Sequence, residues 1–355
     1  MSTVPTLPGI TSRLIKTPRL NVHALFSGDE AAEPVLFIHG NASSSTFWEE
    51  TMLALPKDYR GIALDLRGYG DTDDVLLDAT RGLGDWVDDV TAFLDTLKLE
   101  RVHLVGHSLG GALVYGLVPA LGKRVLTATL VAPASPWGFA GTKDNEGTPN
   151  FDDFAGSGGG LVNPEFARLM GEKNRGSDNP TASPRVVMNT FYWKPPFKPA
   201  REEDLLTSLM TEKIGPQKYP GDSVPSTNWP GLAPGMFGPL NATSAKYMRN
   251  VPDAFIGSSH RPPVLWLRGA DDQIVSDASM FDIGQLGKLG AVPGWPGERL
   301  FPPQPMLGQT RTVLERYTNA GGHYLEVTLA DCGHTPYVEK PAEFNAALHE
   351  HLRTK

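Results

Sequence analysis

The residues Gly106-His107-Ser108-Leu109-Gly110 could carry nucleophilic chemistry, because they follow a short apolar run and precede a helical pattern. A strand that turns directly into a helix holds its serine in a strained backbone. A side chain in place of a flanking glycine would collide with the neighbouring strand and helix. Ser108, at the amino end of the helix, would be exposed, and the backbone N–H of Leu109 would point at a developing oxyanion. The pattern predicts a nucleophile elbow.

A nucleophilic serine also needs a base, an orienting carboxylate and a second oxyanion donor, and a sheet has to position them. After such an elbow the chain order is serine, acid, histidine. Short apolar runs that alternate with helical patterns predict a mostly parallel α/β sheet. We expect strands at residues 35–38, 62–64, 102–105, 128–131, 264–267 and 324–329. We expect helices after Gly84, over residues 112–121 and from Pro341 to about Leu352.

Residues 138–262 interrupt this alternation, since strand runs disappear and glycine and proline become frequent. The segment holds too many aromatic residues for a solvated linker. Its rings either pack over the site or form a small core of their own. The predicted organisation is a core domain of residues 1–137 and 263–355 with a cap of residues 138–262. A second excursion, residues 281–306, is expected to be a long loop near the carboxyl edge of the sheet.

Four motifs are similar to those of the α/β-hydrolase fold family. They are His39-Gly40-Asn41-Ala42, Asp65-Leu66-Arg67-Gly68-Tyr69-Gly70, the Ser108 elbow and Asp331-Cys332-Gly333-His334. The chain resembles the cap-bearing branch, which includes esterases, lactonases, carbon-carbon bond hydrolases, epoxide hydrolases and haloalkane dehalogenases. The resemblance covers residues 10–136 and 262–353. It implies an α/β fold with a mostly parallel central sheet flanked by helices and a large cap inserted between core strands 6 and 7.

The resemblance places the acid after the strand at 264–267, where Gly269-Ala270-Asp271-Asp272-Gln273-Ile274-Val275 resembles the family pattern G-x-x-D-x-x-V. Counting from Gly269 selects Asp272, and Asp271 is the competing carboxylate. Some members carry the acid after the preceding strand instead. Here that strand runs into Ala132-Pro133-Ala134-Ser135, which has no carboxylate, so the later position is favoured.

His334 is the expected base, because it follows the last strand and precedes the last helix. A loop there could hold an imidazole between Ser108 and Asp272, and an imidazole with a pKa near neutrality suits proton exchange with a serine. The other histidines are expected to be structural or solvent-facing. Cys332, two residues before His334, is expected to be a packed structural thiol.

The second oxyanion donor is expected, by the same resemblance, to be the backbone N–H of Asn41, which would act with that of Leu109. The ring of His39 should brace this loop, and His107 should pack beside the nucleophile. His39, Gly40, His107 and Trp137 are the residues expected on the substrate side. Haloalkane dehalogenases carry a similar H-G-N loop but attack with aspartate, whereas Ser108 would form an acyl-enzyme.

Composition and charge exclude several function classes. The 355 residues carry a formal net charge of −8, which disfavours nucleic acid and anionic membranes as partners. The only cysteine, Cys332, excludes an intramolecular disulfide and any multi-cysteine metal site. With no H-E-x-x-H, P-loop or dinucleotide-binding motif, we expect no metal and no cofactor. Residues 1–9 do not read as a signal peptide, and no apolar run approaches 18 residues, so a cytoplasmic protein is expected.

The expected activity is a serine hydrolase that cleaves a carboxylic ester of a small or medium, largely apolar substrate through an acyl-enzyme intermediate. The same residues could serve lactone opening, carbon-carbon cleavage of a diketone, amide hydrolysis or perhydrolysis. A hydrolase-fold receptor with little turnover is the alternative from another class. The partner is a small molecule with an ester-like carbonyl. The oligomeric state stays open, with a homo-oligomer as one alternative.

Overall fold

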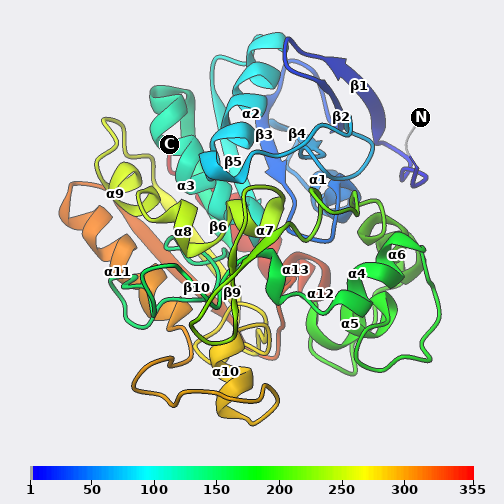
Figure 1. The fold of residues 1–355 in the computed structure, drawn as a ribbon. Helices are drawn as coiled ribbons and strands as arrows, with labels where there is room; N and C mark the ends of the chain where they lie inside the picture. Colours follow the sequence, from blue (N-terminus) through cyan, green and yellow to red (C-terminus); the bar gives the residue numbers. More distant parts are fainter. Residues whose placement is uncertain (1–2) are drawn as a thin grey trace.

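One eight-stranded sheet forms the centre of the molecule (Figure 1). The structure, a computed structural model, describes residues 3–355. Met1 and Ser2 lie outside the described residues. They belong to the predicted core domain and to residues 1–9, which are not expected to be a signal peptide. The strand order is β1-β2-β4-β3-β5-β6-β9-β10. Pairing is antiparallel between β1, β2 and β4 and parallel elsewhere, so the predicted mostly parallel sheet is confirmed. The strands are β1 (Thr11–Lys16), β2 (Asn21–Ser27), β3 (Glu33–Ile38), β4 (Tyr59–Leu64), β5 (Val102–His107), β6 (Val125–Val131), β9 (Val264–Gly269) and β10 (Tyr324–Leu329).

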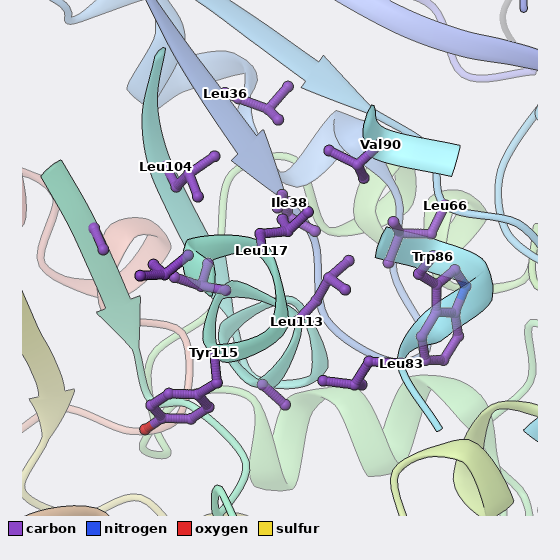
Figure 2. Packing of buried hydrophobic residues seen from close by; sticks show 14 of the residues in the cluster. Leu36, Ile38, Leu66, Leu83, Trp86, Val90, Leu104, Leu113, Tyr115 and Leu117 are labelled. Carbon is purple, nitrogen blue, oxygen red and sulfur yellow. The ribbon is translucent and has the colours of Figure 1, made fainter. Parts of the chain in front are cut away.

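Helices cover both faces of the sheet, because alternate residues of the central strands are apolar on both sides. On one face Leu36 and Leu104 pack with residues of α2, α3 and α11, and Figure 2 shows Leu113 and Trp86 in this cluster. On the other face Phe37 and Val105 belong to a cluster with α1 and α13. The helices are α1 (Glu49–Leu53), α2 (Gly84–Thr96), α3 (Leu109–Leu121), α11 (Met306–Asn319), α12 (Pro336–Glu339) and α13 (Pro341–Leu352).

The structure confirms the six predicted strands and the three predicted helices, and it adds elements that the sequence pattern did not indicate. The strands β1 and β2 were not expected. In β1, an edge strand that pairs only with β2, Leu14 is 60% exposed, so no buried apolar run marks it. The helix α11 was also not expected. The expected loop at 281–306 contains one short helix, α10 (Ile283–Lys288).

Residues 138–262, called the insertion below, lie between β6 and β9 and contribute no strand to the large sheet. The expectation that strands are absent here was wrong in one detail, because β7 and β8, of three residues each, pair with one another. In Figure 1, α4, α5 and α6 form one group, apart from α8 and α9, which lie near α3. The elements of the insertion are α4 (Pro164–Gly171), α5 (Pro184–Phe191), α6 (Glu202–Leu209), β7 (Ser223–Pro225), β8 (Leu232–Pro234), α7 (Pro239–Ala242), α8 (Ala245–Met248) and α9 (Val251–Ile256).

Both halves of the insertion rest on the core. In the first half, Ser208 of α6 is hydrogen-bonded to Ser44 (Oγ–Oγ 2.6 Å). Arg201, just before α6, forms an ion pair with the buried carboxylate of Glu49 (2.6 Å). In the second half, Phe255 of α9 stacks on Tyr317 of α11 with ring centroids 4.5 Å apart. The insertion therefore packs against the core at separate places.

Candidate active site

Ser108 lies at the tight turn between β5 and α3, with φ 53° and ψ −114°. Residues with a side chain rarely adopt a positive φ, and such a conformation costs on the order of 1–3 kcal/mol. Two backbone hydrogen bonds hold the turn: Ser108 N–H donates to Val131 O (2.9 Å), and Ser108 O accepts from Ala134 N–H (3.0 Å). The β6 strand and the residues after it therefore fix the strained serine, whose side chain is only partly buried.

The glycines of the elbow are required by their surroundings. A Cβ on Gly106 would lie 2.2 Å from the carbonyl oxygen of Gly110. A Cβ on Gly110 would lie 2.5 Å from the carbonyl oxygens of Ile38 and His39. The turn thus brings α3 against the end of β3.

His334 and Asp272 form a buried pair. Nδ1 of His334 donates to Oδ2 of Asp272 over 2.7 Å, and both side chains are 3% exposed. The other carboxylate oxygen, Oδ1, accepts from the backbone N–H groups of Ile274 (2.8 Å) and Val275 (3.0 Å). These bonds fix the carboxylate, so the imidazole carries its proton on Nδ1 and leaves Nε2 free to accept a proton.

Asp271, the competing carboxylate, points elsewhere. Its side chain is 41% exposed and lies 3.1 Å from Nζ of Lys194, which also contacts Asp331. The structure thus brings His334 together with Asp272, the residue that counting from Gly269 selected.

His107 braces the loop that carries His334. Its Nε2 donates to the backbone carbonyl of His334 (2.9 Å), and its Nδ1 accepts from the Tyr337 hydroxyl (3.2 Å). The two imidazole centroids are 4.6 Å apart. Burial lowers the pKa of His107 well below its ordinary value, and a charge on His334 would lower it further. His107 is therefore neutral and has both ring nitrogens occupied, which suits a supporting contact.

The loop from His39 to Ser43 lies against Ser108. A Cβ on Gly40 would be 3.0 Å from Cβ of Ser108. The Gly40 carbonyl accepts from Nδ1 of His39 (2.7 Å) and from Oγ of Ser43 (2.9 Å). Nε2 of His39 in turn accepts from the backbone N–H of Leu66 (3.0 Å). Burial lowers the pKa of His39, so its neutral ring holds the loop as expected.

These contacts also orient the backbone N–H of Asn41. A planar trans peptide points its N–H away from its carbonyl, and the Gly40 carbonyl is fixed by two donors. Among residues 3–355, the N–H groups of Asn41 and Leu109 donate no hydrogen bond. Two backbone donors, one in the loop that lies against Ser108 and one at the start of α3, are therefore without a partner in this part of the chain.

The insertion reaches this site through Tyr192, which follows α5. Its hydroxyl donates to the carbonyl of Ala42 (2.8 Å), and its own carbonyl accepts from the N–H of Thr335 (2.8 Å). Its ring centroid is 6.5 Å from that of His334. In the sequence, Tyr192 is one of many aromatic residues of the insertion and has no predicted role of its own. No motif marks it, so only the fold could identify it.

Trp137, expected on the substrate side, lies just before the insertion and is half-buried. Its backbone N–H donates to Oγ of Ser135 (3.2 Å), and its ring lies against Gly147, where an added Cβ would be 2.3 Å from the ring. Among the described residues, it forms no hydrogen bond and no ring pair with Ser108 or His334. Its role in substrate binding stays a prediction.

One group of three potential metal ligands occurs in the described part of the chain: His23, Asp65 and Asp71. Its central carboxylate, that of Asp65, already accepts from Nδ1 of His23 (2.7 Å) and from the N–H groups of Ser45 (2.8 Å) and Asp71 (2.9 Å). Burial alone would raise the pKa of Asp65, but the His23 bond and the other donors lower it below its ordinary value. These bonds explain the cluster as a brace for the motif that starts at Asp65.

Within residues 3–355, no helix combines the length and the apolar character needed to cross a bilayer.

Comparison with known proteins gives a family model described as "Alpha/beta hydrolase family", which matches residues 35–347. The acetyltransferase component of the acetoin cleaving system of Cupriavidus necator is 37% identical over 102 residues, or 29% of this chain and 27% of that protein. The chain thus spans about a quarter of the length of such curated relatives.

Solved structures resemble the whole chain. The esterase RhEst1 from Rhodococcus sp. ECU1013 has a TM-score of 0.60 and 20% identity, covering 98% of this chain and 99% of that one. The 2-hydroxy-6-oxo-6-phenylhexa-2,4-dienoate hydrolase from Rhodococcus sp. strain RHA1 has a TM-score of 0.60 and 18% identity, covering 99% and 100%. At this identity the likeness shows the fold alone.

Proposed function

Because this chain belongs to the alpha/beta hydrolase family, we propose that it cleaves carboxylic esters with Ser108 as nucleophile, His334 as base and Asp272 as the orienting carboxylate. The observation that carries the proposal is the buried 2.7 Å hydrogen bond from His334 to Asp272. It lies in a fold whose elbow presents a strained serine. A serine in this setting forms an acyl-enzyme with a carbonyl substrate.

In the first step, Oγ of Ser108 attacks the ester carbonyl and its proton passes to Nε2 of His334. Asp272 stabilises the imidazolium that forms, because its carboxylate is fixed by two backbone donors and faces Nδ1. His334 then gives the proton to the leaving alcohol. The products of this step are the free alcohol and an ester between Ser108 and the acyl group.

The carbonyl oxygen gains negative charge during the attack, and we assign its stabilisation to the N–H groups of Asn41 and Leu109. Both donors belong to backbone held by other contacts, so little reorganisation is needed when the charge develops. The amino end of α3 adds the favourable field of the helix dipole. In the second step, water attacks the acyl carbon while His334 takes its proton; the bond to Oγ of Ser108 then breaks, Oγ receives that proton, and the carboxylic acid is released.

We also propose that residues 138–262 act as a cap over a core formed by residues 1–137 and 263–355. The support is Tyr192, which touches the loop of Asn41 and the loop of His334 at once. Phe191, beside it, contacts Phe281 edge-to-face, with centroids 4.9 Å apart. Aromatic rings at this place favour an apolar acyl or alcohol group of small or medium size.

A series of p-nitrophenyl esters of increasing acyl length tests the proposal. Three proteins are assayed with and without a chelator: the wild type, Ser108→Ala and the control Ser259→Ala. Ser259 is an exposed serine, distant in sequence from Ser108. We expect turnover that is lost in Ser108→Ala, kept in Ser259→Ala and indifferent to the chelator. An optimum in acyl length would measure the size of the pocket.

Labelling by a fluorophosphonate separates the alternatives. If Ser108 is labelled but no ester is hydrolysed, the activity is not ester cleavage, and lactones, amides and diketones are the next substrates to assay. If Ser108→Ala retains full ester turnover, the proposed nucleophile is wrong.

A further inference from the structure

A buried carboxyl group of the insertion lies beside the Asn41 loop without a role in the chemistry described above. Glu212, which follows α6, is 4% exposed, and neither of its carboxyl oxygens completes a hydrogen bond among the described residues. The groups that adjoin it are the Tyr69 hydroxyl and the backbone N–H of Ala42. A buried carboxyl left without partners is costly, so its presence here calls for an explanation.

The next residue holds Glu212 in place. The backbone N–H of Lys213 donates to the carbonyl of Gly68 (2.9 Å), and its Nζ donates to the carbonyl of Gly70 (2.8 Å). Lys213 therefore binds both neighbours of Tyr69, and its charge is directed at the Gly70 carbonyl. The insertion is docked on the turn that carries Tyr69.

Tyr69 in turn holds Asn41. Its hydroxyl donates to Oδ1 of Asn41 over 2.9 Å, and its ring lies edge-on to that of His39, with centroids 4.9 Å apart. A tyrosine hydroxyl has one proton to donate. The Tyr69 hydroxyl donates that proton to Asn41, so toward Glu212 it can act only as an acceptor. Glu212 can donate to it only if the carboxyl group is protonated.

The charges around Glu212 also favour its protonated, neutral form. The ionisable groups that adjoin it are Tyr69, Tyr192 and Tyr219, all buried, and no cation is among the groups that act on it. Burial, the largest effect on Glu212, raises its pKa well above the ordinary value. An ionised carboxylate here would lack both water and a counter-ion.

We propose that Glu212 is a positioning residue: as a neutral carboxylic acid it donates to the Tyr69 hydroxyl, which holds Asn41 and thereby the oxyanion loop. This inference rests on the proposed function, because it assigns the N–H of Asn41 to the oxyanion hole. The insertion then sets the geometry of the core's catalytic loop. Loss of the Glu212 contact lets Asn41 move, and displacement of a donor by about 1 Å is enough to slow the reaction ~100-fold.

The test compares Glu212→Gln, which keeps a donor of the same shape, with Glu212→Ala, which removes it. We expect Glu212→Ala to lower kcat by ~10- to 100-fold with little change in KM, and Glu212→Gln to restore most of kcat at pH 7. Above the pKa of Glu212, wild-type kcat should fall while that of Glu212→Gln stays level. Lys288→Ala, at an exposed ion pair with Glu298, is the control.

A second readout does not need turnover. Unfolded Glu212 ionises near its ordinary pKa while the folded group stays protonated. Wild type therefore loses stability relative to Glu212→Gln as pH rises above that value. The melting temperature of Glu212→Gln minus that of wild type should grow from pH 4.5 to pH 8.

The outcomes separate the two proposals. A difference in melting temperature that does not change with pH would overturn the neutral state of Glu212. Equal rates of fluorophosphonate labelling for wild type and Glu212→Ala would overturn its positioning role. If no ester is turned over, the labelling rate and the melting temperatures still decide the question of Glu212.

Discussion

His107 and His334 are joined by a 2.9 Å hydrogen bond from the imidazole Nε2 of His107 to the backbone carbonyl of His334. His107 ends the central strand β5 and His334 follows the edge strand β10, so the loop after β10 returns past β9 and β6 to the end of β5. The bond fixes the backbone of the base, while Asp272 fixes its ring. Two separate contacts therefore determine where Nε2 of His334 lies.

Replacing His107 by leucine tests this brace. His107→Leu leaves the His334 carbonyl and the Tyr337 hydroxyl without their partner, and each buried unpaired group costs about 1–3 kcal/mol. We expect kcat to fall ~10-fold or more with KM nearly unchanged. Tyr337→Phe, which keeps the His334 bond, should stay within about threefold of wild type. Equal kcat in His107→Leu and wild type would show that the brace has no part in catalysis.

The two neighbouring aspartates should differ sharply. In Asp272→Asn an amide replaces the acceptor of the His334 proton, which disfavours the required tautomer, and kcat should fall by about 10⁴-fold. Asp271→Asn removes only an exposed contact with Lys194, which is worth about 0–1 kcal/mol, and should leave kcat within about twofold. Steady-state kinetics of the two variants on one ester decide the matter. Equal losses would contradict the choice of Asp272.

Acid should destabilise the protein through its buried histidines. Burial lowers the pKa of His351 to about 4, while Nε2 donates to the carbonyl of Ala128 (3.2 Å). In the unfolded chain, the imidazole of His351 takes up a proton near the ordinary histidine pKa of 6.5. The unfolded state therefore binds more protons between pH 6.5 and 4, and stability falls as pH drops through that window.

Urea unfolding at pH 7.5 and pH 5 measures the effect. His351→Gln should lose less stability between the two pH values than wild type does, whereas His323→Gln, at an exposed position, should follow wild type. Parallel losses in all three proteins would mean that His351 does not contribute to the acid sensitivity.

Gly110 should tolerate no side chain. In Gly110→Ala the new Cβ would lie 2.5 Å from two backbone oxygens of the β3 end, and backbone cannot give way as a flexible side chain does. We expect destabilisation above ~4 kcal/mol or no folded protein at all. Gly171→Ala, whose new Cβ would meet nothing closer than 3.5 Å, is the control. Circular dichroism and melting curves of both variants provide the measurement.

The sequence allowed the sheet centre and the site loops to be predicted because both are local patterns. In the Ser108 elbow, Gly106 is required by a contact with Gly110, only a few residues along the chain, and the central strands are buried on both faces, so their apolar runs are continuous. By contrast, β1 was not predicted, because it is a half-exposed edge strand that gains its structure from pairing with β2. The half-exposed β1 has no continuous apolar run from which it could be recognised, whereas β10, at the other edge of the sheet, was predicted.

Glu212 and Tyr192 show what local patterns cannot indicate. Each lies in the insertion, more than 140 residues from the Asn41 loop that it adjoins, and its surroundings come from contacts with that loop. From the sequence alone, a single glutamate after a helix is expected to be charged and exposed to solvent. Only the docking of the insertion buries it, so its environment follows from tertiary structure.

The ion pair between Arg201 and Glu49 limits how this protein could be recombined with its relatives. A chimera that received another protein's insertion in place of residues 138–262 would keep the buried Glu49 carboxylate but lose the guanidinium that neutralises it. Breaking a buried pair in this way costs about 3–5 kcal/mol. Ser44 would lose Ser208 in the same exchange. A graft of the insertion therefore needs at least residues 39–49 with it, and we expect grafts that include them to be more stable than bare swaps.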